Sequence, residues 1–172
     1  YQDAATYHSF PDGYARTAGP VVQTSKSFTV SAWVKLTATG GTHQTVVSQQ
    51  GSAYCAFYLR YNPDGKWHLE LLNNINGGSF TIASAISSVS AVAGTWVHLV
   101  GVYDAAAAQG QIYVNGTASG SASVPSGVAA SGPVIIGAAW SGATWQDRLT
   151  GEIDDVQLWE RTLTTTEISQ LF

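Results

Sequence analysis

The sequence predicts an all-β fold, a two-sheet antiparallel β-sandwich with one short C-terminal helix. Apolar and polar residues alternate in short runs, and Gly, Pro, Asn and Asp separate these runs at intervals of about ten residues, which is typical of sandwiches. Only 10% of the residues are charged and 18 are glycines, a composition poor in helix formers and rich in turn formers. A chain of 172 residues without a linker or internal repeat is expected to form one domain, 1–172, around one core.

The alternation places strands at residues 6–10, 13–17, 28–36, 44–50, 55–62, 66–73, 79–86, 95–104, 110–115, 133–139 and 149–160. Two hairpin turns are marked by Asn62-Pro63-Asp64-Gly65 and by Asn115-Gly116, because Asn and Gly tolerate the positive φ angles that tight turns require. Asp104 ends a strand, where its carboxylate can hold a turn. Residues 119–132 are rich in Ser, Ala and Gly, and we expect them to form an exposed edge or loop.

One helix is expected at residues 165–171, at the C-terminal end of the sequence. Thr164 is a favourable N-cap residue, and Glu167 three positions later completes a capping box. Ile168 and Leu171 lie three residues apart and therefore share one face of the helix. We expect this apolar face to seal an end of the sandwich.

Four segments, in order, resemble the laminin-G-like, concanavalin A-like jelly-roll family: 28–34 (FTVSAWV), 95–104 (TWVHLVGVYD), 112–116 (IYVNG) and 151–168. The resemblance covers residues 10 to 172. It implies two antiparallel sheets packed as a jelly roll. Members of this family are mostly extracellular accessory modules attached to glycoside hydrolases, lyases or adhesins. Many bind glycans and others bind proteins.

Composition narrows the partners. The net charge is −4, and the seven Lys and Arg residues are scattered, so the chain lacks the basic patch that nucleic-acid binding requires. No apolar run approaches the roughly 20 residues that span a bilayer, and no membrane partner is expected. The chain starts at Tyr1 and has no Met, from which we expect a module excised from a larger secreted protein. The single Cys55 is expected to be a small buried side chain.

No catalytic residues are predicted, and the chain is expected not to be an enzyme. Glu152-Ile153-Asp154 is similar to the start of the Glu-x-Asp-x-Glu strand motif of retaining β-glucanases, in which two carboxylates share one face. Here Val156 occupies the last position, or Gln157 in the version of the motif that has one extra residue before the last Glu. Neither side chain can transfer a proton. The four histidines do not fall at metal-ligand spacing, and the sequence has no Gly-x-Ser-x-Gly nucleophile elbow.

The resemblance also implies a calcium site, because some relatives carry a structural calcium ion. Asp154 stands at the family's acidic position in the closing strand, and Asp12 resembles its early Asp-Gly turn. Calcium prefers six to eight oxygen ligands, so backbone carbonyls and water would have to complete the site. In the alternative interpretation, Asp154 accepts hydrogen bonds from turn amides and Asp12 begins a turn.

Sugar binding is the favoured function, because pyranose rings stack their C–H faces on aromatic side chains while polar groups fix the hydroxyls. Alternation places Tyr58 and Arg60 on one face of their strand, and His68 and Glu70 on one face of the next. We expect these four to form a polar, aromatic patch. It has two interpretations, a glycan-binding groove or an ordinary solvated face.

Trp140 and Trp145 are further candidates for ligand binding. They lie in a loop-like stretch, 139–147, where a tryptophan either packs over the end of the sandwich or meets a ligand. Together with the patch, they predict a non-catalytic, lectin-like carbohydrate-binding module, exported and accessory to a polysaccharide-acting enzyme. Two alternatives stay open: a protein-interaction or adhesion module, and a structural appendage that stabilises a neighbouring catalytic domain.

Overall fold

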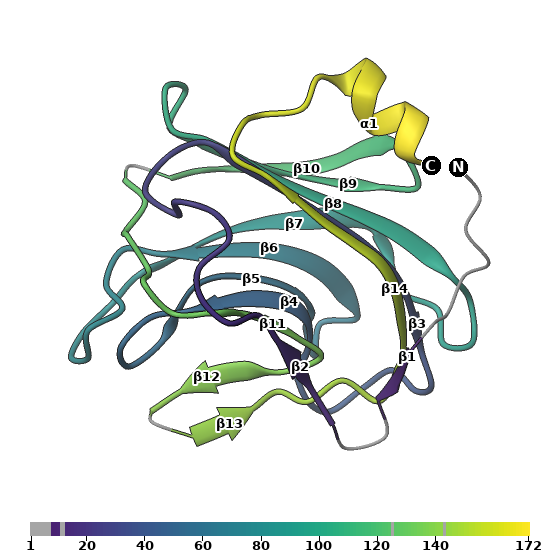
Figure 1. Cartoon of the computed structure of the whole chain (residues 1–172). Coiled ribbons are helices and arrows are strands. Elements are labelled where there is room, and N and C mark those ends of the chain that lie inside the picture. The colour runs from purple at the N-terminus through teal and green to yellow at the C-terminus, as the bar shows by residue number, and fades with distance from the viewer. Residues whose placement is uncertain (1–7, 11–12, 125, 143) are drawn as a thin grey trace.

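The computed structural model describes residues 8–10, 13–124, 126–142 and 144–172. Most strands lie in two six-stranded antiparallel sheets, which confirms the predicted sandwich (Figure 1). The first sheet has the order β1 (His8–Phe10), β14 (Gly151–Trp159), β3 (Phe28–Leu36), β8 (Val97–Asp104), β9 (Gln109–Val114), β10 (Thr117–Ser123). The second has the order β2 (Ala15–Arg16), β11 (Val134–Ile136), β4 (Gln44–Gln50), β5 (Cys55–Tyr61), β6 (Lys66–Leu72), β7 (Ile82–Ser90).

The core lies between the two sheets and follows the period-2 pattern of the strands. Phe28 on β3 of the first sheet packs against Phe57 on β5 of the second, with ring centroids 4.8 Å apart. Leu59 and Leu69 follow on the same face of the second sheet, and both are fully buried. The packing of one sheet on the other therefore brings together side chains that are distant in the sequence.

The two sheets meet along one side, where the edge strands β7 and β10 lie next to each other. Ser88 N on β7 donates to Ser119 Oγ on β10 at 3.0 Å, and a bulge in β10 falls between Ala118 and Gly120. A Cβ atom on Gly120 would lie 1.9 Å from the Ile86 carbonyl oxygen. The close approach of the two edges therefore requires glycine at this position.

The predicted turns form as expected. Asn115 and Gly116 have φ angles of 50° and 72°, which a tight hairpin turn needs. Asp104 Oδ1 accepts from the amides of Ala106 and Ala107 at 2.9 and 3.0 Å. The segment expected to be an edge or loop begins inside β10, which is an edge strand of the first sheet.

Helix α1 (Thr165–Leu171) has the predicted capping box. Glu167 N donates to Thr164 Oγ1 at 3.2 Å, and Thr164 N donates to Glu167 Oε2 at 2.8 Å. Its expected position at an end of the sandwich is wrong. Buried Ile168 packs with Val100 and Tyr113, which are outward-facing residues of β8 and β9. Helix α1 therefore covers the outer face of the first sheet (Figure 1). No helix in the described ranges is long and apolar enough to cross a membrane.

The loop-like stretch 139–147 is a third, small sheet and not an irregular loop. β12 (Ala139–Ser141) pairs with β13 (Thr144–Gln146) in a hairpin. A bridge between Tyr54 and Ser141 ties β12 to the start of β5. The β12–β13 hairpin lies over the outer face of the second sheet, on the opposite side of the molecule from α1 (Figure 1).

Candidate functional site

The four patch residues come together on the outer face of the second sheet, as predicted. β5 and β6 are paired so that Tyr58 lies opposite Glu70 and Arg60 lies opposite His68. Side chains on directly opposed residues point to the same side of a sheet. The inward-facing neighbours Leu59 and Leu69 belong to the core, which fixes this register.

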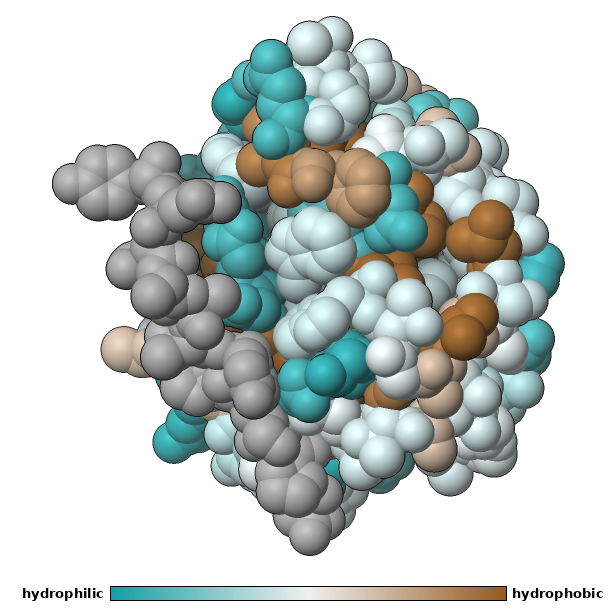
Figure 2. Space-filling view, turned by 90° about the vertical axis from the view of Figure 1, so that its right-hand side faces the viewer, coloured by the Kyte–Doolittle hydropathy of each residue, from teal (hydrophilic) through white to brown (hydrophobic). Residues whose placement is uncertain are grey.

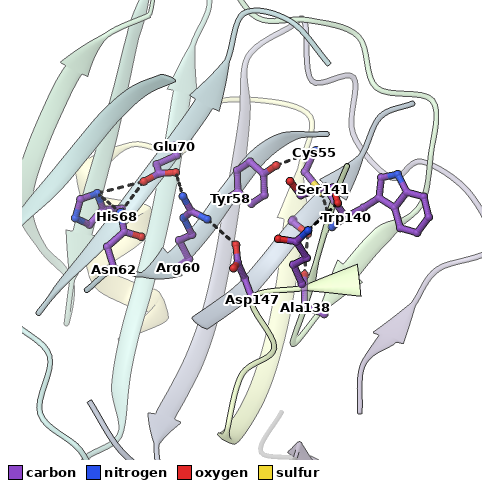
Figure 3. Close-up of polar contacts among 12 residues, drawn as sticks. Cys55, Tyr58, Arg60, Asn62, His68, Glu70, Ala138, Trp140, Ser141 and Asp147 are labelled. Carbon is purple, nitrogen blue, oxygen red and sulfur yellow. Dashed lines mark hydrogen bonds and ion pairs between the residues drawn. The ribbon is translucent and has the colours of Figure 1, made fainter. Parts of the chain in front are cut away.

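Arg60 is the centre of a charged network on this face (Figure 3). Its Nη2 contacts Glu70 Oε2 at 2.5 Å, and its Nη1 contacts Asp147 Oδ2 at 2.9 Å. Asn62 Nδ2 donates to Glu70 Oε1 at 2.7 Å. Asp147 follows the β12–β13 hairpin, so one guanidinium links the sheet to the segment that covers it.

The solvated-face interpretation of this patch is wrong. The Arg60 and Glu70 side chains are only 9% and 4% exposed, and Tyr58 and His68 are also buried. The hairpin and Asp147 lie over positions that alternation alone assigns to solvent. Because Arg60 binds both Glu70 and Asp147, the polar groups of this network hold the hairpin in place and are not open to a sugar.

His68 occupies the side of the network away from the hairpin (Figure 3). Its Nε2 lies 3.0 Å from Asp64 Oδ2, and its Nδ1 lies 3.5 Å from Glu70 Oε1 and 2.7 Å from Ser84 Oγ. Burial alone would lower the pKa of His68, but its hydrogen bonds to Glu70 and Asp64 outweigh burial and raise it. The two neighbouring carboxylates therefore make His68 easier to protonate than a free imidazole.

Glu70 is held in its ionised form. Burial would raise the pKa of its carboxyl, but the hydrogen bond with His68 and the charge of Arg60 lower it below the usual range. His43 is also within electrostatic reach of the network, and burial followed by the Arg60 charge lowers its pKa. The pKa values of the two imidazoles on this face are therefore shifted in opposite directions, upward for His68 and downward for His43.

The two predicted tryptophans lie on the β12–β13 hairpin, and both are partly buried. Their rings meet edge to face, with centroids 4.9 Å apart. Tyr14 stacks on Trp145 at 4.3 Å with an interplanar angle of 27°. In Figure 3 the Trp140 indole points away from the Arg60 network. Trp145 is directly paired with Trp140, so both rings lie on the same, aromatic side of the hairpin.

Small polar contacts anchor this aromatic cluster of Tyr14, Trp140 and Trp145. Trp140 N donates to Cys55 Sγ at 3.3 Å, and Ser48 Oγ donates to the Ala138 carbonyl at 3.0 Å. Cys55 is fully buried, as predicted, and burial raises the pKa of its thiol. Cys55 is therefore a structural contact of the hairpin and not a nucleophile.

Of the two predicted metal ligands, only Asp154 lies within the described residues. Asp154 Oδ1 accepts from the Asp155 amide at 2.8 Å, which matches the alternative interpretation of a turn contact. Asp12 lies outside the described residues. Across the described ranges, no group of three or more His, Cys, Asp or Glu side chains is placed to hold a metal ion. Calcium binding therefore stays a prediction.

A serine–histidine contact occurs on the outer face of the first sheet. Ser31 Oγ lies 2.8 Å from His98 Nε2, and Trp33 packs on the imidazole at a centroid distance of 5.1 Å. Ser31 and His98 are each only 1% exposed, so no substrate reaches them. Burial lowers the pKa of His98, and its contacts with Ser31 and Trp33 are those of a structural residue.

Sequence reasoning missed Asp147 as a member of the site. It also left Asn62 and Asp64 out of the site, because it used them as the end of a strand and as turn residues. Asp147 is 87 positions from Arg60 along the chain. The sequence feature that could have pointed to Asp147 is its position directly after the two tryptophans, in the pair Asp147-Arg148.

The two packed antiparallel sheets, with a hairpin over one outer face, define a lectin-like jelly-roll protein. A family model, Laminin_G_3, described as the concanavalin A-like lectin/glucanases superfamily, matches residues 9–169. The chain therefore belongs to this superfamily, as the four sequence segments predicted. No curated protein sequence matches it significantly.

Solved structures share the fold at low sequence identity. A native heptameric SAP-like pentraxin from Limulus polyphemus is 20% identical, with a TM-score of 0.64 over 99% of this chain and 77% of that chain. The CBM40 module of a Ruminococcus gnavus IT-sialidase, bound to α2,3-sialyllactose, is 16% identical, with a TM-score of 0.69 over 85% and 82%. The NanB sialidase of Streptococcus pneumoniae is 19% identical, with a TM-score of 0.68 over 84% of this chain but only 24% of that one.

Proposed function

We propose that this protein is a non-catalytic carbohydrate-binding module and that it binds a glycan at the aromatic side of the β12–β13 hairpin. The observation that carries the proposal is the aromatic cluster of Tyr14, Trp140 and Trp145. These rings are packed on one another and only partly buried. Membership of the concanavalin A-like lectin/glucanases superfamily supports carbohydrate binding, as does the shared fold of a module solved with sialyllactose.

The physical basis is preorganisation. Indole faces offer flat apolar area to the C–H face of a pyranose, and rigid aromatic rings lose little conformational entropy on binding. The Arg60–Asp147 ion pair and the Cys55 contact fix the hairpin before a ligand arrives.

Two observations support binding without hydrolysis. A glycosidase needs a carboxyl group with a raised pKa as general acid, whereas the pKa of Glu70 is lowered and its side chain is buried. Glu152, in the broken glucanase-like motif, is paired with Lys35 Nζ at 2.8 Å. These carboxylates serve as ion-pair partners.

The parent protein is part of the proposal. The chain spans about a quarter of the NanB sialidase chain, so modules of this fold also occur within longer enzymes. We infer a secreted parent with a covalently linked catalytic domain that this module keeps close to its polysaccharide.

An adhesion role would instead use a continuous apolar patch. On the β1–β14 side of the molecule, the part not covered by grey atoms has apolar side chains in small separate groups (Figure 2).

Affinity electrophoresis and calorimetry against a panel of polysaccharides and sialylated oligosaccharides test the proposal. Trp140→Ala and Trp145→Ala are expected to reduce affinity at least about tenfold, since buried aromatic anchors commonly contribute more than about 1.4 kcal/mol. Phe172→Ala is the matched control, because Phe172 is an exposed aromatic residue beside Trp33 on the opposite sheet. Absence of retention on every glycan, or equal losses in the control, would refute the assignment and favour a protein-binding or structural role.

A further inference from the structure

An open pocket of about 320 Å³ lies on the outer face of the first sheet, the sheet that the β12–β13 hairpin does not cover. Its volume is within the range of small-molecule sites. Among the described residues, Trp33, Trp96 and Asp154 line it. Asp154 on β14 lies directly opposite Trp33 on β3, and both point outward because the neighbouring Val34 belongs to the core. Trp96 directly precedes β8, the next strand of this sheet.

The two indoles have fixed neighbours, and one of these neighbours is a cation. The Trp33 ring centroid lies 5.1 Å from that of His98 and 5.7 Å from that of Phe172, which follows α1. Lys35 Nζ lies 5.2 Å from the ring centroid of Trp96. A positive charge is attracted by the electron-rich face of an aromatic ring, and Trp attracts cations more strongly than Tyr or Phe. The indoles at this pocket are therefore preorganised, and one of them already interacts with a positive charge.

The charge around the pocket is negative. Lys35 is paired with Glu152 at 2.8 Å, so these two charges offset each other. In the described ranges, neither Asp154 nor Asp155 has an ion-pair partner. Burial lowers the pKa of His98 and the Asp155 charge opposes this effect, so Asp155 lies close to the same face. A positively charged ligand would therefore meet two carboxylates that no cation of the described structure offsets.

The lining also determines which kind of cation fits. Asp154 Oδ1 already accepts from the Asp155 amide at 2.8 Å, and indole rings accept no strong hydrogen bond. A primary ammonium has three N–H donors, and in this pocket most of them would lose water without gaining an acceptor, which costs free energy. A quaternary ammonium has no N–H donor and presents methyl groups, which pack well on indoles. The lining therefore favours a quaternary over a primary ammonium.

We propose that this pocket binds a quaternary ammonium group. Its methyl groups pack against Trp33 and Trp96, and the Asp154 carboxylate balances its positive charge. Cation–π attraction and charge complementarity together stabilise the bound group. The pocket and the aromatic cluster on the hairpin lie on different sheets. The inference therefore goes beyond the proposed glycan binding and does not depend on it.

Titration of ¹⁵N-labelled protein with choline and with 3,3-dimethyl-1-butanol tests the inference, because the alcohol has the same shape with carbon in place of the charged nitrogen. Both titrations contain chelator, so that calcium does not occupy Asp154. Choline is expected to shift the indole N–H resonances of Trp33 and Trp96 in a saturable way, with an affinity at least about tenfold higher than that of the alcohol. Co-sedimentation with phosphatidylcholine vesicles, with and without choline as competitor, distinguishes a lipid headgroup from a soluble compound as the source of the group.

Asp154→Asn removes the charge and keeps the shape of the side chain, so it should weaken choline binding about threefold to tenfold. Glu160→Gln is the matched control, because Glu160 is an exposed carboxylate directly after β14 and is not among the residues that line the pocket. Trp33→Phe and Trp96→Phe keep a ring that attracts cations less strongly, and each should weaken binding about twofold to fivefold.

Trp140→Ala and Trp145→Ala should leave choline binding unchanged, so failure of glycan binding at the hairpin and failure at this pocket are distinguishable. Three results would overturn the proposal: indole resonances that do not respond to choline, an equal response to the uncharged alcohol, or an affinity for choline that Asp154→Asn does not lower.

Discussion

Replacing Arg60 with alanine should destabilise the protein strongly, because Arg60 neutralises carboxylates from two directions. Glu70, on the neighbouring strand, is 4% exposed, and Asp147, after the hairpin, is 22% exposed. Without the guanidinium, Glu70 becomes a buried charge with only Asn62 and His68 beside it. Asp147 can instead turn toward solvent.

The expected magnitude follows from this difference in burial. Removing one partner of a buried ion pair costs about 3–5 kcal/mol, whereas Asp147→Asn removes a partly exposed partner and should cost about 1 kcal/mol. For a domain of this size, 1 kcal/mol corresponds to roughly 2–4 °C in Tm. Arg60→Ala should therefore lower Tm by about 6–20 °C, and Asp147→Asn by about 2–4 °C.

Calorimetry of the two single variants, of Glu70→Gln and of the Arg60→Ala/Glu70→Gln double variant measures both costs and their coupling. The double variant should be more stable than Arg60→Ala, because it no longer contains an unpaired buried charge. If Asp147→Asn proves as damaging as Arg60→Ala, the argument from the difference in burial fails. A loss below about 1 kcal/mol for Arg60→Ala would show that the network contributes little to stability.

Three further predictions concern pH, calcium and packing. The pKa of His68 is raised in the folded protein above its unfolded value of about 6.5. The contribution of His68 to stability is therefore complete below about pH 6.5 and is lost as the pH rises through the folded pKa. His68→Gln should reduce the loss of Tm over this pH range, and an unchanged dependence of Tm on pH would contradict the prediction. Calcium should raise Tm relative to chelator, with Asp154→Asn abolishing the rise; identical melting in calcium and chelator would remove the metal. Gly120→Ala should cost about 1–3 kcal/mol in urea unfolding, because its Cβ would clash with the Ile86 carbonyl, while Gly19→Ala, with open space around it, should be neutral.

Local signals in the sequence were sufficient for most of the fold. Strand boundaries at 28–36 and 44–50 agree with β3 and β4, because period-2 alternation and flanking turn residues lie within a few positions of each other. The capping box of α1 depends on Thr164 and Glu167 alone. The position of α1 could not be predicted in the same way, since it depends on outward-facing apolar residues of other strands.

For the candidate site, the sequence predicted which side chains share one face of the sheet, but not which segment covers that face. Alternation places Arg60 and Glu70 correctly on one side of the sheet, but it contains no information on what covers that side. Charged residues are rarely buried without a partner, so a solvated face was the natural expectation. The missing partner, Asp147, comes from a distant segment, and only the folded topology brings it within reach.

The buried network holds the hairpin in place. Substitutions in the network should therefore change both stability and ligand affinity, whereas substitutions of the hairpin tryptophans should change mainly ligand affinity. Arg60→Ala should lower both Tm and glycan affinity, since the hairpin loses its ion pair with the sheet. Trp140→Ala should lower affinity with a smaller change in Tm, because the Trp140 side chain is only partly buried and points away from the network (Figure 3). If Arg60→Ala melts early but retains full affinity at low temperature, the hairpin does not need its anchor to bind, and the argument from preorganisation fails.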